Sequence, residues 1–472
     1  MNAFYIDIDK YQDKVALVTE TGKQITYAQL TEDADNLFQD IPARSLIFLV
    51  CKNCQESVTG YVGCQRKKIV PIMINDGIGE ELFVQLSENY HPQYIYAPAQ
   101  FIDEIRIEQG KIKKIKEFGQ YNLYETKFKE SIALYDELAL LLTTSGSTGS
   151  PKLVRQSYKN INSNTDSIAS YLDIGENDRA ITTMPMSYTY GLSIINSHLY
   201  KGARIILNDY ALVNKEFWQL LKNEKATTFG GVPYIYEILK KLRFNRMDLP
   251  GLKYITQAGG KLSKELAREF NEICVSKGIK MIVMYGQTEA TARMSYLPWE
   301  NAAEKAGSMG IAIPNGRFEL IDANGNIIEE SDVAGELVYY GDNVTLGYAE
   351  SINDLSKGDE NKGVLHTGDM AKRDEDGYYY IVGRKKRFLK IFGNRINLDE
   401  VEGILKKEGY ICVCAGKDDK MKIYTTQVEK CNEITNYISK QTGLHPSAFE
   451  TVYIEEIPRN EAGKILYSAL PE

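Results

Sequence analysis

The sequence predicts an α/β fold with a large N-terminal domain and a small α+β domain at the C-terminus. Through most of the chain, short apolar runs alternate with amphipathic segments, which is typical of strands alternating with helices. From about Gly316 the pattern changes to short strands separated by turn residues. After Arg384 a basic run begins, and a new pattern continues to the C-terminus. We therefore predict domains at residues 1–385 and 386–472, with a β-rich subdomain at about 316–385.

The expected strands of the first part are short apolar runs followed by polar or glycine-containing segments. They cover residues 46–50, 69–74, 138–142, 204–207, 254–257 and 281–284. Amphipathic segments between them, such as 157–171 and 215–223, predict helices. The β-rich part has expected strands at 318–321, 335–340 and 378–382, and the C-terminal domain is expected to run strand, helix, strand, helix, strand.

Composition and charge narrow the class of protein. Of the 472 residues, 43% are apolar and 25% are charged, which is ordinary for a globular chain. The net charge of -8 argues against a nucleic-acid partner, because binding a phosphate backbone requires clustered Lys and Arg. The basic run 111–116 alternates with apolar residues and is interpreted as a solvated strand edge. No segment approaches the ~18 apolar residues of a membrane span, so we expect no stable membrane insertion.

Targeting signals and cysteines indicate a cytoplasmic protein with reduced thiols. The start of the chain, MNAFYIDIDK, lacks the basic and apolar regions of a signal peptide. The seven cysteines are odd in number and show no framework spacing. Cys51 and Cys54 have no second pair, so we expect them to mark a helix start rather than a metal site. Cys412 and Cys414 alternate on an expected strand.

Residues 141–152, LLTTSGSTGSPK, are the most informative stretch of the chain. The preceding apolar strand leads into a loop of Thr, Ser and Gly. Gly146 and Gly149 allow backbone angles that let successive N–H groups converge on an anion, the hydroxyls add donors, and Lys152 adds a positive charge. The loop is not a Walker A motif, because Pro151 occupies the position of a required Gly. The pattern favours polyphosphate binding over the alternative of a flexible Ser/Gly turn.

Two further motifs follow predicted strands, where α/β proteins commonly bind ligands. Ala258-Gly259-Gly260 follows the strand 254–257 and would let a flat ligand approach the backbone. The motif YGQTE, residues 285–289, follows the strand 281–284. It supplies an aromatic for a base, a hydroxyl, and a carboxylate for Mg²⁺, which prefers one or two carboxylates plus phosphate oxygens. The alternative for each motif is an ordinary turn or a polar loop.

Three motifs lie later in the chain. His366-Thr-Gly-Asp369 precedes an expected strand, and a carboxylate beside a Gly suits the two hydroxyls of a ribose. Gly383-Arg384 follows the strand 378–382. Lys464 lies in PRNEAGK, on a glycine-containing loop where a lone Lys is otherwise solvated.

In combination these motifs resemble one family. The order TSGSTGSPK, AGG, YGQTE, HTGD, GRKKRFLKIFGNRINLDEVE and NEAGK is similar to that of the adenylate-forming superfamily. That superfamily contains acyl-CoA synthetases, adenylation domains of peptide synthetases and firefly luciferases, and this chain looks nearest to the stand-alone acyl-CoA synthetases. The resemblance covers about residues 20–470, and its motifs are specific together although each is weak alone.

The resemblance implies a site for ATP and Mg²⁺. The β- and γ-phosphates would lie on the loop formed by Thr144, Ser145, Gly146, Ser147, Thr148 and Gly149, with Lys152. The base would contact Ala258, Gly259, Gly260, Tyr285, Gly286 and Gln287. Thr288 would contact phosphate, and Glu289 would hold Mg²⁺. Asp369 would bind the ribose hydroxyls, assisted by Arg384.

The resemblance also implies a mobile C-terminal domain that takes part in catalysis. Lys464 would bridge the substrate carboxylate and the α-phosphate during adenylation. Lys386 falls at the family's hinge, and Gly393 and Arg395 fall in the loop that shapes the thiol tunnel. In the family the small domain rotates between two half-reactions, which accounts for a catalytic Lys far from the other motifs.

The implied reaction has two halves. Attack of a carboxylate on the ATP α-phosphate gives an acyl-AMP and pyrophosphate, and AMP is then a good leaving group for a thiol. Neither half needs a His base, because positioning and charge neutralisation by Mg²⁺ and Lys carry the catalysis. A chain with only four His suits this mechanism.

Three positions depart from the family pattern. Leu153 replaces the usual Gly after the loop's Lys, and Tyr188 stands where many acyl-CoA synthetases have His. Peptide-synthetase domains carry an Asp where this chain has Thr189, and an unpaired ammonium in a buried pocket is costly. We therefore expect an acyl or aryl pocket rather than an amino-acid pocket. Its candidate lining residues are Tyr188, Gly191, Val232, Tyr234 and Lys261.

The sequence thus predicts an AMP-forming acid–thiol ligase for a fatty, aryl or other acid without an α-amino group. The acceptor would be CoA or the phosphopantetheine of a carrier protein. We expect a separate acceptor molecule, because no carrier domain follows before Glu472. The alternative is a stand-alone amino-acid adenylation enzyme that loads a carrier protein. An alternative of another class is an inactive nucleotide-binding scaffold.

Overall fold

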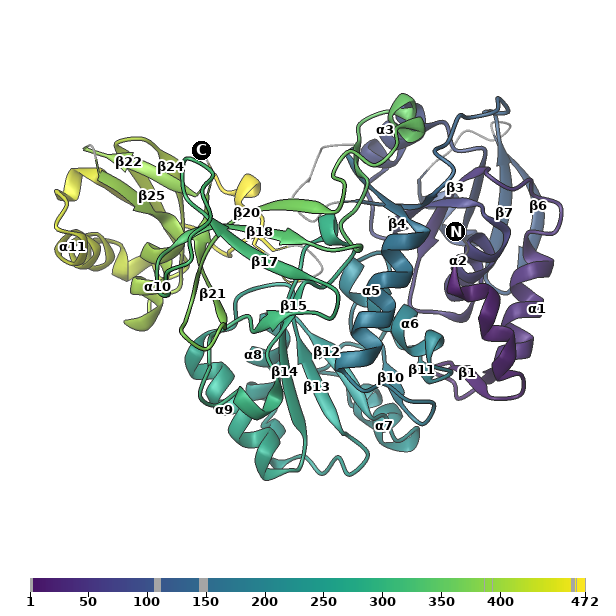
Figure 1. Cartoon of the computed structure of the whole chain (residues 1–472), viewed down its shortest axis with the longest axis horizontal. Helices are drawn as coiled ribbons and strands as arrows, with labels where there is room; N and C mark the ends of the chain where they lie inside the picture. The colour runs from purple at the N-terminus through teal and green to yellow at the C-terminus, as the bar shows by residue number, and fades with distance from the viewer. Residues whose placement is uncertain are drawn as a thin grey trace. The chain divides into compact units, whose positions relative to one another are not determined.

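The computed structural model describes residues 3–105, 112–143, 152–385, 387–392, 394–459, 463 and 465–471. The chain forms two compact units (Figure 1). The first contains Met1–Arg317 and Tyr340–Leu365, and the second contains Phe318–Tyr339 and His366–Glu472. The β-rich segment is therefore grouped mostly with the C-terminal residues. A domain boundary at 386 stays a prediction.

One sheet of the first unit has nine strands. Its middle six strands are parallel, and antiparallel strands close both edges. Across the sheet the strands are β16 (Ile311–Ala312), β15 (Ser295–Tyr296), β14 (Lys280–Tyr285), β13 (Tyr254–Gln257), β12 (Thr228–Gly231), β10 (Arg179–Ile181), β11 (Arg204–Ile206), β1 (Val15–Val18) and β2 (Gln24–Thr26). The parallel strands have a common direction, so their carboxyl ends lie at one edge of the sheet.

The second sheet of this unit has eight strands. In order these are β19 (Gly347–Ala349), β9 (Leu153–Ser157), β8 (Leu138–Thr143), β4 (Val70–Asn75), β3 (Leu46–Cys51), β5 (Tyr94–Pro98), β7 (Tyr121–Thr126) and β6 (Ile112–Phe118). Every residue of β3 is buried, as expected for a central parallel strand covered on both faces. β6 is the edge strand and its lysines 113 and 114 are exposed, which confirms the strand edge predicted from the basic run.

Helices pack against both sheets. They are α1 (Tyr27–Leu37), α2 (Gln55–Lys67), α3 (Glu80–Tyr90), α4 (Ala99–Glu104), α5 (Tyr158–Tyr171), α6 (Thr189–Tyr200), α7 (Lys215–Asn223), α8 (Pro233–Lys241) and α9 (Lys264–Ser276). Local signals explain several starts: Ser157 and Asn160 form a capping box at α5, and Pro233 opens α8. Cys54 is the N-cap of α2, which confirms the helix start expected there.

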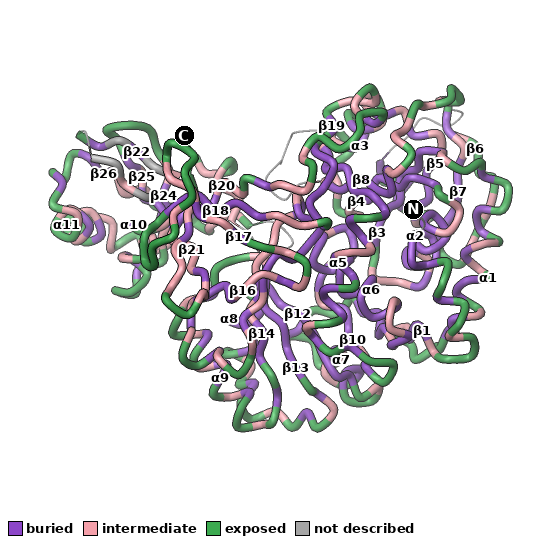
Figure 2. Tube along the Cα trace, viewed as in Figure 1, coloured by how far each residue is buried: buried purple, intermediate pink, exposed green. Residues whose placement is uncertain are grey.

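The distribution of burial shows where the core lies. In Figure 2 central strands such as β3 and β13 are buried, whereas the outer faces of helices such as α1 and α9 are exposed. Apolar strand residues and the inner faces of the helices form the core clusters of the first unit. All seven cysteines are free thiols. No helix in the described part of the chain is long and apolar enough to cross a membrane.

The described part of the second unit contains strands, most of them short, and two α-helices. Its strands are β17 (Arg317–Ile321), β18 (Gly335–Tyr340), β20 (Val364–Arg373), β21 (Tyr379–Arg384), β22 (Phe388–Ile391), β23 (Asn394–Asn397), β24 (Cys412–Lys417), β25 (Lys420–Thr425) and β26 (Phe449–Tyr453), and its helices are α10 (Leu398–Lys407) and α11 (Cys431–Thr442). β17, β18, β20 and β21 form one sheet, and β24, β25 and β26 form another, in which β26 pairs with β25 in parallel. Both helices contribute to the core that includes the second of these sheets.

Three predictions for this region were wrong in detail. The first two expected strands of the C-terminal domain are each a two-stranded hairpin, β22–β23 and β24–β25. Asp418 and Asp419 form the second turn, and Asp419 adopts φ 62°, a conformation that Asp tolerates better than most residues. The motif HTGD lies inside β20 rather than before a strand. Gly383-Arg384 ends β21 instead of following it.

Candidate active site

The carboxyl ends of β12, β13 and β14 bring three predicted motifs to one edge of the large sheet. The parallel register pairs Gly231 with Gln257 and Gln257 with Val283, so the three strands end nearly level. The segment 258–261 follows the end of β13, whereas 230–234 and 285–289 begin in the last residues of β12 and β14 (Figure 1). Ligands of open α/β sheets bind at such an edge. The fold therefore groups the residues expected to contact the base with those expected to contact the acid.

The loop after β13 brings base-side and acid-side residues together at one point. Gly259 adopts φ +79°, and a Cβ there would lie 2.7 Å from Oη of Tyr188 and 3.0 Å from Cγ1 of Val232. Any larger residue would therefore clash with both side chains and strain the backbone. Gln257 Nε2 donates to the carbonyl of Gly260 at 2.9 Å and holds the turn, while Lys261 is exposed.

The beginning of α6 lines the expected acyl pocket with uncharged aromatic groups. Tyr188 is the N-cap residue, and burial raises the pKa of its phenol well above the ordinary value. Tyr190 hydrogen-bonds Thr256 at 2.8 Å, and burial raises the pKa of Tyr190 to about 12. Gly191 lies in the same helical turn, and Tyr234 lies in the first turn of α8 with 43% exposure. The phenols of Tyr188 and Tyr190 therefore stay neutral at physiological pH.

Thr189 uses its hydroxyl within the protein. The side chain is buried, and Oγ1 donates to the backbone carbonyl of Thr291. A hydroxyl committed to a carbonyl carries no charge with which to bind an ammonium group. The hydrogen bond of Thr189 therefore affects which class of acid the expected pocket can accept.

The motif YGQTE forms the end of β14 and a short helix, η3 (Thr288–Ala290). Gln287 Nε2 donates to Oη of Tyr285 at 3.1 Å, so the two side chains that we expect beside the base are linked. Glu289 accepts a hydrogen bond from Tyr348 Oη at 2.8 Å on its carboxylate. Its backbone carbonyl accepts from the amide and the hydroxyl of Thr345, both at 3.0 Å. Glu289 is therefore held both by a hydrogen bond to its carboxylate and by hydrogen bonds to its backbone carbonyl.

The donor set around Glu289 fits Mg²⁺ bound together with a nucleotide. Within the described ranges, no group of three or more His, Cys, Asp or Glu side chains could hold a metal alone. Mg²⁺ does not need such a group when substrate phosphates supply the other oxygens. Glu289 would be the protein's ligand, and the ion would neutralise charge on the phosphates.

The phosphate loop connects two antiparallel strands. Thr143 at the end of β8 pairs with Leu153 at the start of β9, which differs from the strand–loop–helix arrangement of a Walker A site. Thr144, Ser145, Gly146, Ser147, Thr148 and Gly149 lie outside the described residues. Lys152 is described: its Nζ lies 3.7 Å from the centre of the Tyr348 ring and 3.7 Å from Oε1 of Glu350.

The expected ribose-binding residues lie in the second unit. Asp369 on β20 pairs with Arg384 on β21, and the Asp369 side chain is 7% exposed. Asp369 N donates to Thr367 Oγ1 at 3.1 Å, and that hydroxyl donates to the carbonyl of Leu337 at 2.7 Å. The structure thus brings Asp369 and Arg384 together, as their expected joint role requires.

The residues expected at the hinge, in the thiol tunnel and in adenylation lie in the C-terminal part of the chain. Lys386, Gly393 and Lys464 lie outside the described residues. Arg395 lies on β23, where its backbone pairs with Lys390. Their assigned roles at the hinge, in the thiol tunnel and in adenylation stay predictions.

Sequence reasoning missed two residues, Tyr348 and Arg155. Tyr348 contacts both Glu289 and Lys152, and Arg155 fixes the strand that carries it. One signal was present: Arg155 is a charged residue in a strand of otherwise apolar or neutral residues, LVRQS. A cation at such a position must find acceptors inside the protein, which marks it as a structural anchor.

The comparisons with known proteins agree with this geometry. The model of the AMP-binding enzyme family matches residues 4–349. A medium-chain fatty-acid–CoA ligase of Escherichia coli is 25% identical, over 96% of this chain and 86% of its own length. A 2-succinylbenzoate–CoA ligase of Oceanobacillus iheyensis is 24% identical, over 97% of this chain and 96% of its own length.

A solved structure confirms the fold class. The o-succinylbenzoate CoA synthetase of Bacillus subtilis, in complex with the acyl-adenylate intermediate OSB-AMP, superposes with a TM-score of 0.79 at 21% identity. The match covers 100% of this chain and 98% of that chain. At this identity the likeness shows the fold alone and does not identify the substrate of this chain.

Proposed function

The chain belongs to the family of AMP-binding enzymes, and from this premise we propose that it is an AMP-forming acid–thiol ligase. It activates a carboxylic acid with ATP to an acyl-AMP and then transfers the acyl group to the thiol of CoA. The observation that carries the proposal is the set of motifs at the carboxyl edge of β12, β13 and β14. A family match over most of the chain, and relatives named as CoA ligases, support it.

In the first half-reaction a carboxylate oxygen attacks the α-phosphorus, and pyrophosphate leaves with the electrons of the broken P–O bond. Tyr285 and Gly259 position the base, and Asp369 holds the ribose. Lys152 lowers the cost of bringing two anions together. Mg²⁺, held by Glu289 and the phosphates, would supply further charge neutralisation. Lys464 would reach the attacking carboxylate and the α-phosphate.

In the second half-reaction a thiolate attacks the acyl carbon and AMP leaves. The protein has to exclude water and to hold the thiol in line with the acyl group, because the adenylate is already activated. The family's rotation of its small domain would move Lys464 away and bring Gly393 and Arg395 to the thiol. Lys386 is the proposed pivot.

We assign the substrate to acids without an α-amino group. The hydroxyl of buried Thr189 is bonded to the carbonyl of Thr291, and Tyr188 and Tyr190 stay uncharged. An ammonium placed there would lose its water shell without gaining a charged partner, at a cost of several kcal/mol. The test compares each amino acid with its deaminated analogue at saturating ATP. A clear preference for the amino acids would instead establish amino-acid activation for a carrier protein.

The proposal also concerns the thiol acceptor and the location of the protein in the cell. We favour CoA because both curated relatives described above are named as CoA ligases. A carrier-protein phosphopantetheine presents the same thiol, so the two acceptors have to be compared directly. The cytoplasmic location expected from the sequence stays a prediction.

Analysis of the nucleotide products tests the central claim. The protein is incubated with ATP, Mg²⁺, CoA and a panel of fatty, aryl and dicarboxylic acids, and the products are separated by chromatography. We expect AMP and pyrophosphate in equal amounts with the correct acid, and neither without acid. Formation of ADP and inorganic phosphate would refute adenylate formation. Binding of ATP without product formation from any acid would favour the inactive nucleotide-binding scaffold.

A further inference from the structure

We propose that Tyr348 is a positioning residue that holds the Glu289 carboxylate and the Lys152 ammonium in place before the nucleotide binds. The inference rests on the proposed function, because it assigns the metal ligand and the phosphate-loop cation to these two residues. It adds a residue that belongs to none of the predicted motifs. The phenol ring and the phenol hydroxyl have separate tasks.

The hydroxyl acts on Glu289. Tyr348 Oη donates a hydrogen bond to Oε1 of Glu289 at 2.8 Å. A donor bonded to one oxygen restricts the rotamers of the carboxylate and leaves its other oxygen available to a metal ion. Partners of this kind orient metal ligands in many sites.

The ring acts on Lys152. The ammonium lies 3.7 Å from the ring centre, well within the range of a cation–π contact. A flexible Lys side chain has to give up rotamer freedom when it binds phosphate. A contact that already holds its head group near the loop reduces this entropic cost. Tyr348 therefore connects the cation of the phosphate loop to the expected metal ligand through a single side chain.

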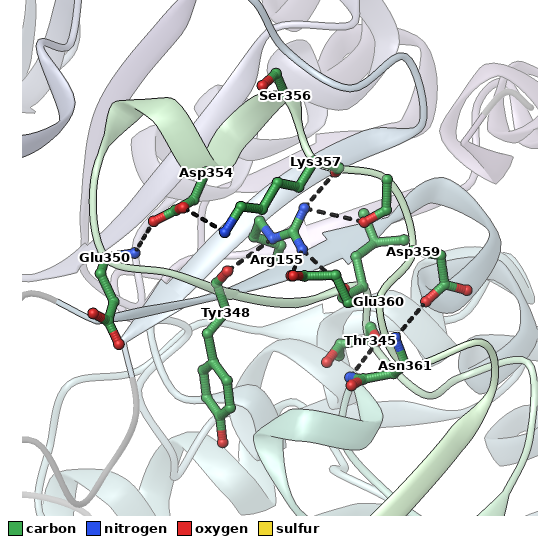
Figure 3. Close-up of polar contacts among 12 residues, drawn as sticks. Arg155, Thr345, Tyr348, Glu350, Asp354, Ser356, Lys357, Asp359, Glu360 and Asn361 are labelled. Carbon is green, nitrogen blue, oxygen red and sulfur yellow. Dashed lines mark hydrogen bonds and ion pairs between the residues drawn. The ribbon is translucent and has the colours of Figure 1, made fainter.

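Tyr348 can do this because its backbone is fixed. β19 pairs with β9, and this register places Tyr348 opposite Val154, two residues after Lys152. Arg155, whose side chain is fully buried, donates from Nε to the carbonyl of Tyr348 at 3.0 Å and from Nη2 to that of Leu346 at 2.9 Å. Figure 3 shows the guanidinium at the centre of this segment, with the Tyr348 ring pointing away from it.

The guanidinium of Arg155 also anchors the segment that follows β19. Arg155 also donates to the carbonyls of Lys357 and Gly358 and pairs with Glu360 (Figure 3). Gly347 has φ +115°, and a Cβ there would lie 2.9 Å from Oε2 of Glu360 and 3.2 Å from Nη2 of Arg155. Only glycine fits without strain beside the ion pair. The ion pair of Arg155 thus requires a glycine at position 347. The hydrogen bonds of Arg155 to the backbone in turn fix where the Tyr348 phenol lies.

The experiment separates the two tasks by substitution. Tyr348→Phe keeps the ring and removes the hydroxyl, whereas Tyr348→Leu removes both. Tyr90→Phe is the matched control, since the buried Tyr90 hydroxyl donates to the carbonyl of Ala349 at 2.7 Å, on the same strand. ATP binding is measured by calorimetry over a range of Mg²⁺ concentrations, without any acid, and the thermal midpoint of each variant is recorded.

We expect Tyr348→Phe to raise the Mg²⁺ concentration for half-maximal ATP binding by about tenfold, the lower end of the range for partners of metal ligands. Its ATP affinity at saturating Mg²⁺ should stay near that of the wild type. Tyr348→Leu should show the same Mg²⁺ shift and should also weaken ATP binding at saturating Mg²⁺. Tyr90→Phe should change the thermal midpoint without a shift in the Mg²⁺ dependence.

A Mg²⁺ dependence of Tyr348→Phe equal to that of Tyr90→Phe would overturn the inference, because Tyr348 would then contribute only to the stability of the fold. Equal effects of Phe and Leu on ATP affinity would overturn the part that concerns Lys152. The proposed function fails in a different way: wild-type protein would bind ATP with Mg²⁺ and yet yield no AMP with any acid. Binding in the absence of acid is measured first, so the two failures are distinguishable.

Discussion

Asp369 lies directly opposite Arg384 on the neighbouring strand, and Nε of Arg384 is 3.4 Å from Oδ1 of Asp369. The two side chains differ in environment, since the carboxylate is 7% exposed and the guanidinium 65% exposed. An ion pair of this kind adds little stability on its exposed side. Its value lies in orienting the carboxylate. The pairing places two motifs that are separated in the sequence side by side, as their proposed joint role on the ribose requires.

The first prediction concerns recognition of the ribose. If Asp369 binds the hydroxyls, wild-type protein should prefer ATP over 2′-deoxy-ATP by about tenfold, since hydrogen bonds to charged groups contribute about 1.5–3 kcal/mol. Asp369→Ala should weaken ATP binding and bring that preference close to one. Competition binding with the two nucleotides measures it. The exposed Asp332, which pairs with Lys372 in the same unit, provides the control variant Asp332→Ala. A preference retained by Asp369→Ala would remove the residue from the ribose site.

The second prediction concerns Lys464. Lys464→Ala should slow formation of the acyl-adenylate by ~10²–10³, the usual effect of removing one preorganised group that stabilises transition-state charge. Transfer to the thiol, started from synthetic acyl-adenylate, should be much less affected, because the residue would have moved away. Each half-reaction is measured separately on the folded variant. Equal loss in both halves would show that the assigned role is wrong.

The third prediction concerns the stability of the first unit. Arg155→Met should lower its free energy of unfolding by about 3–5 kcal/mol, because several buried carbonyls lose their donor. Glu360→Gln should cost less than about 1 kcal/mol, since Glu360 is 49% exposed and the backbone bonds of Arg155 remain. Urea unfolding followed by fluorescence compares the variants. Similar losses for both would assign the anchor to the ion pair instead of the carbonyls.

The fourth prediction concerns pH. His198 is buried in α6, its Nδ1 lies 2.8 Å from the carbonyl of Ile194, and burial lowers its pKa from 6.5 to about 4. Between these two values the unfolded chain binds more protons than the folded one, so stability falls as pH falls through this window. The contribution of this residue should be a loss of about 2 kcal/mol between pH 7 and pH 5.

His198→Asn should flatten that part of the pH dependence, whatever it does to stability at pH 7. His91→Asn is the control, since His91 stacks on Phe128 at the C-cap of α3 in the same unit. Urea midpoints at several pH values between 4.5 and 7 (about half a unit apart) provide the measurement. An unchanged slope in His198→Asn would assign the acid sensitivity to other groups.

Local patterns predicted much of the fold. β13 begins and ends where the apolar run 254–257 does, and α7 covers the predicted residues 215–223, because turn residues or a clear amphipathic pattern mark their limits. The β24–β25 hairpin was not predicted, since its turn at Asp418 and Asp419 carries no Gly to mark it. Short antiparallel strands also give weaker periodicity than buried parallel ones.

The site was predictable where a motif supplies the chemistry and not where distant contacts do. Tyr285, Glu289 and Asp369 lie in short motifs with distinctive residues. Tyr348 stands in an unremarkable strand, and nothing local shows that its hydroxyl meets a carboxylate fifty-nine positions earlier in the chain. The role of Arg155 likewise depends on carbonyls in a segment that follows much later. Such relationships depend on tertiary structure, which a single sequence does not show.

The anchor at Arg155 also has a consequence for how the protein is made. Its carbonyl acceptors at Leu346, Tyr348 and Lys357 lie 191, 193 and 202 residues further along the chain. While the chain emerges from the ribosome, β9 is therefore present long before its edge can be covered. Contacts of such long range slow folding and leave a strand edge exposed in the meantime. A nascent chain that ends before Gly347 would lack β19 and with it Tyr348, so the nucleotide site is completed late in synthesis.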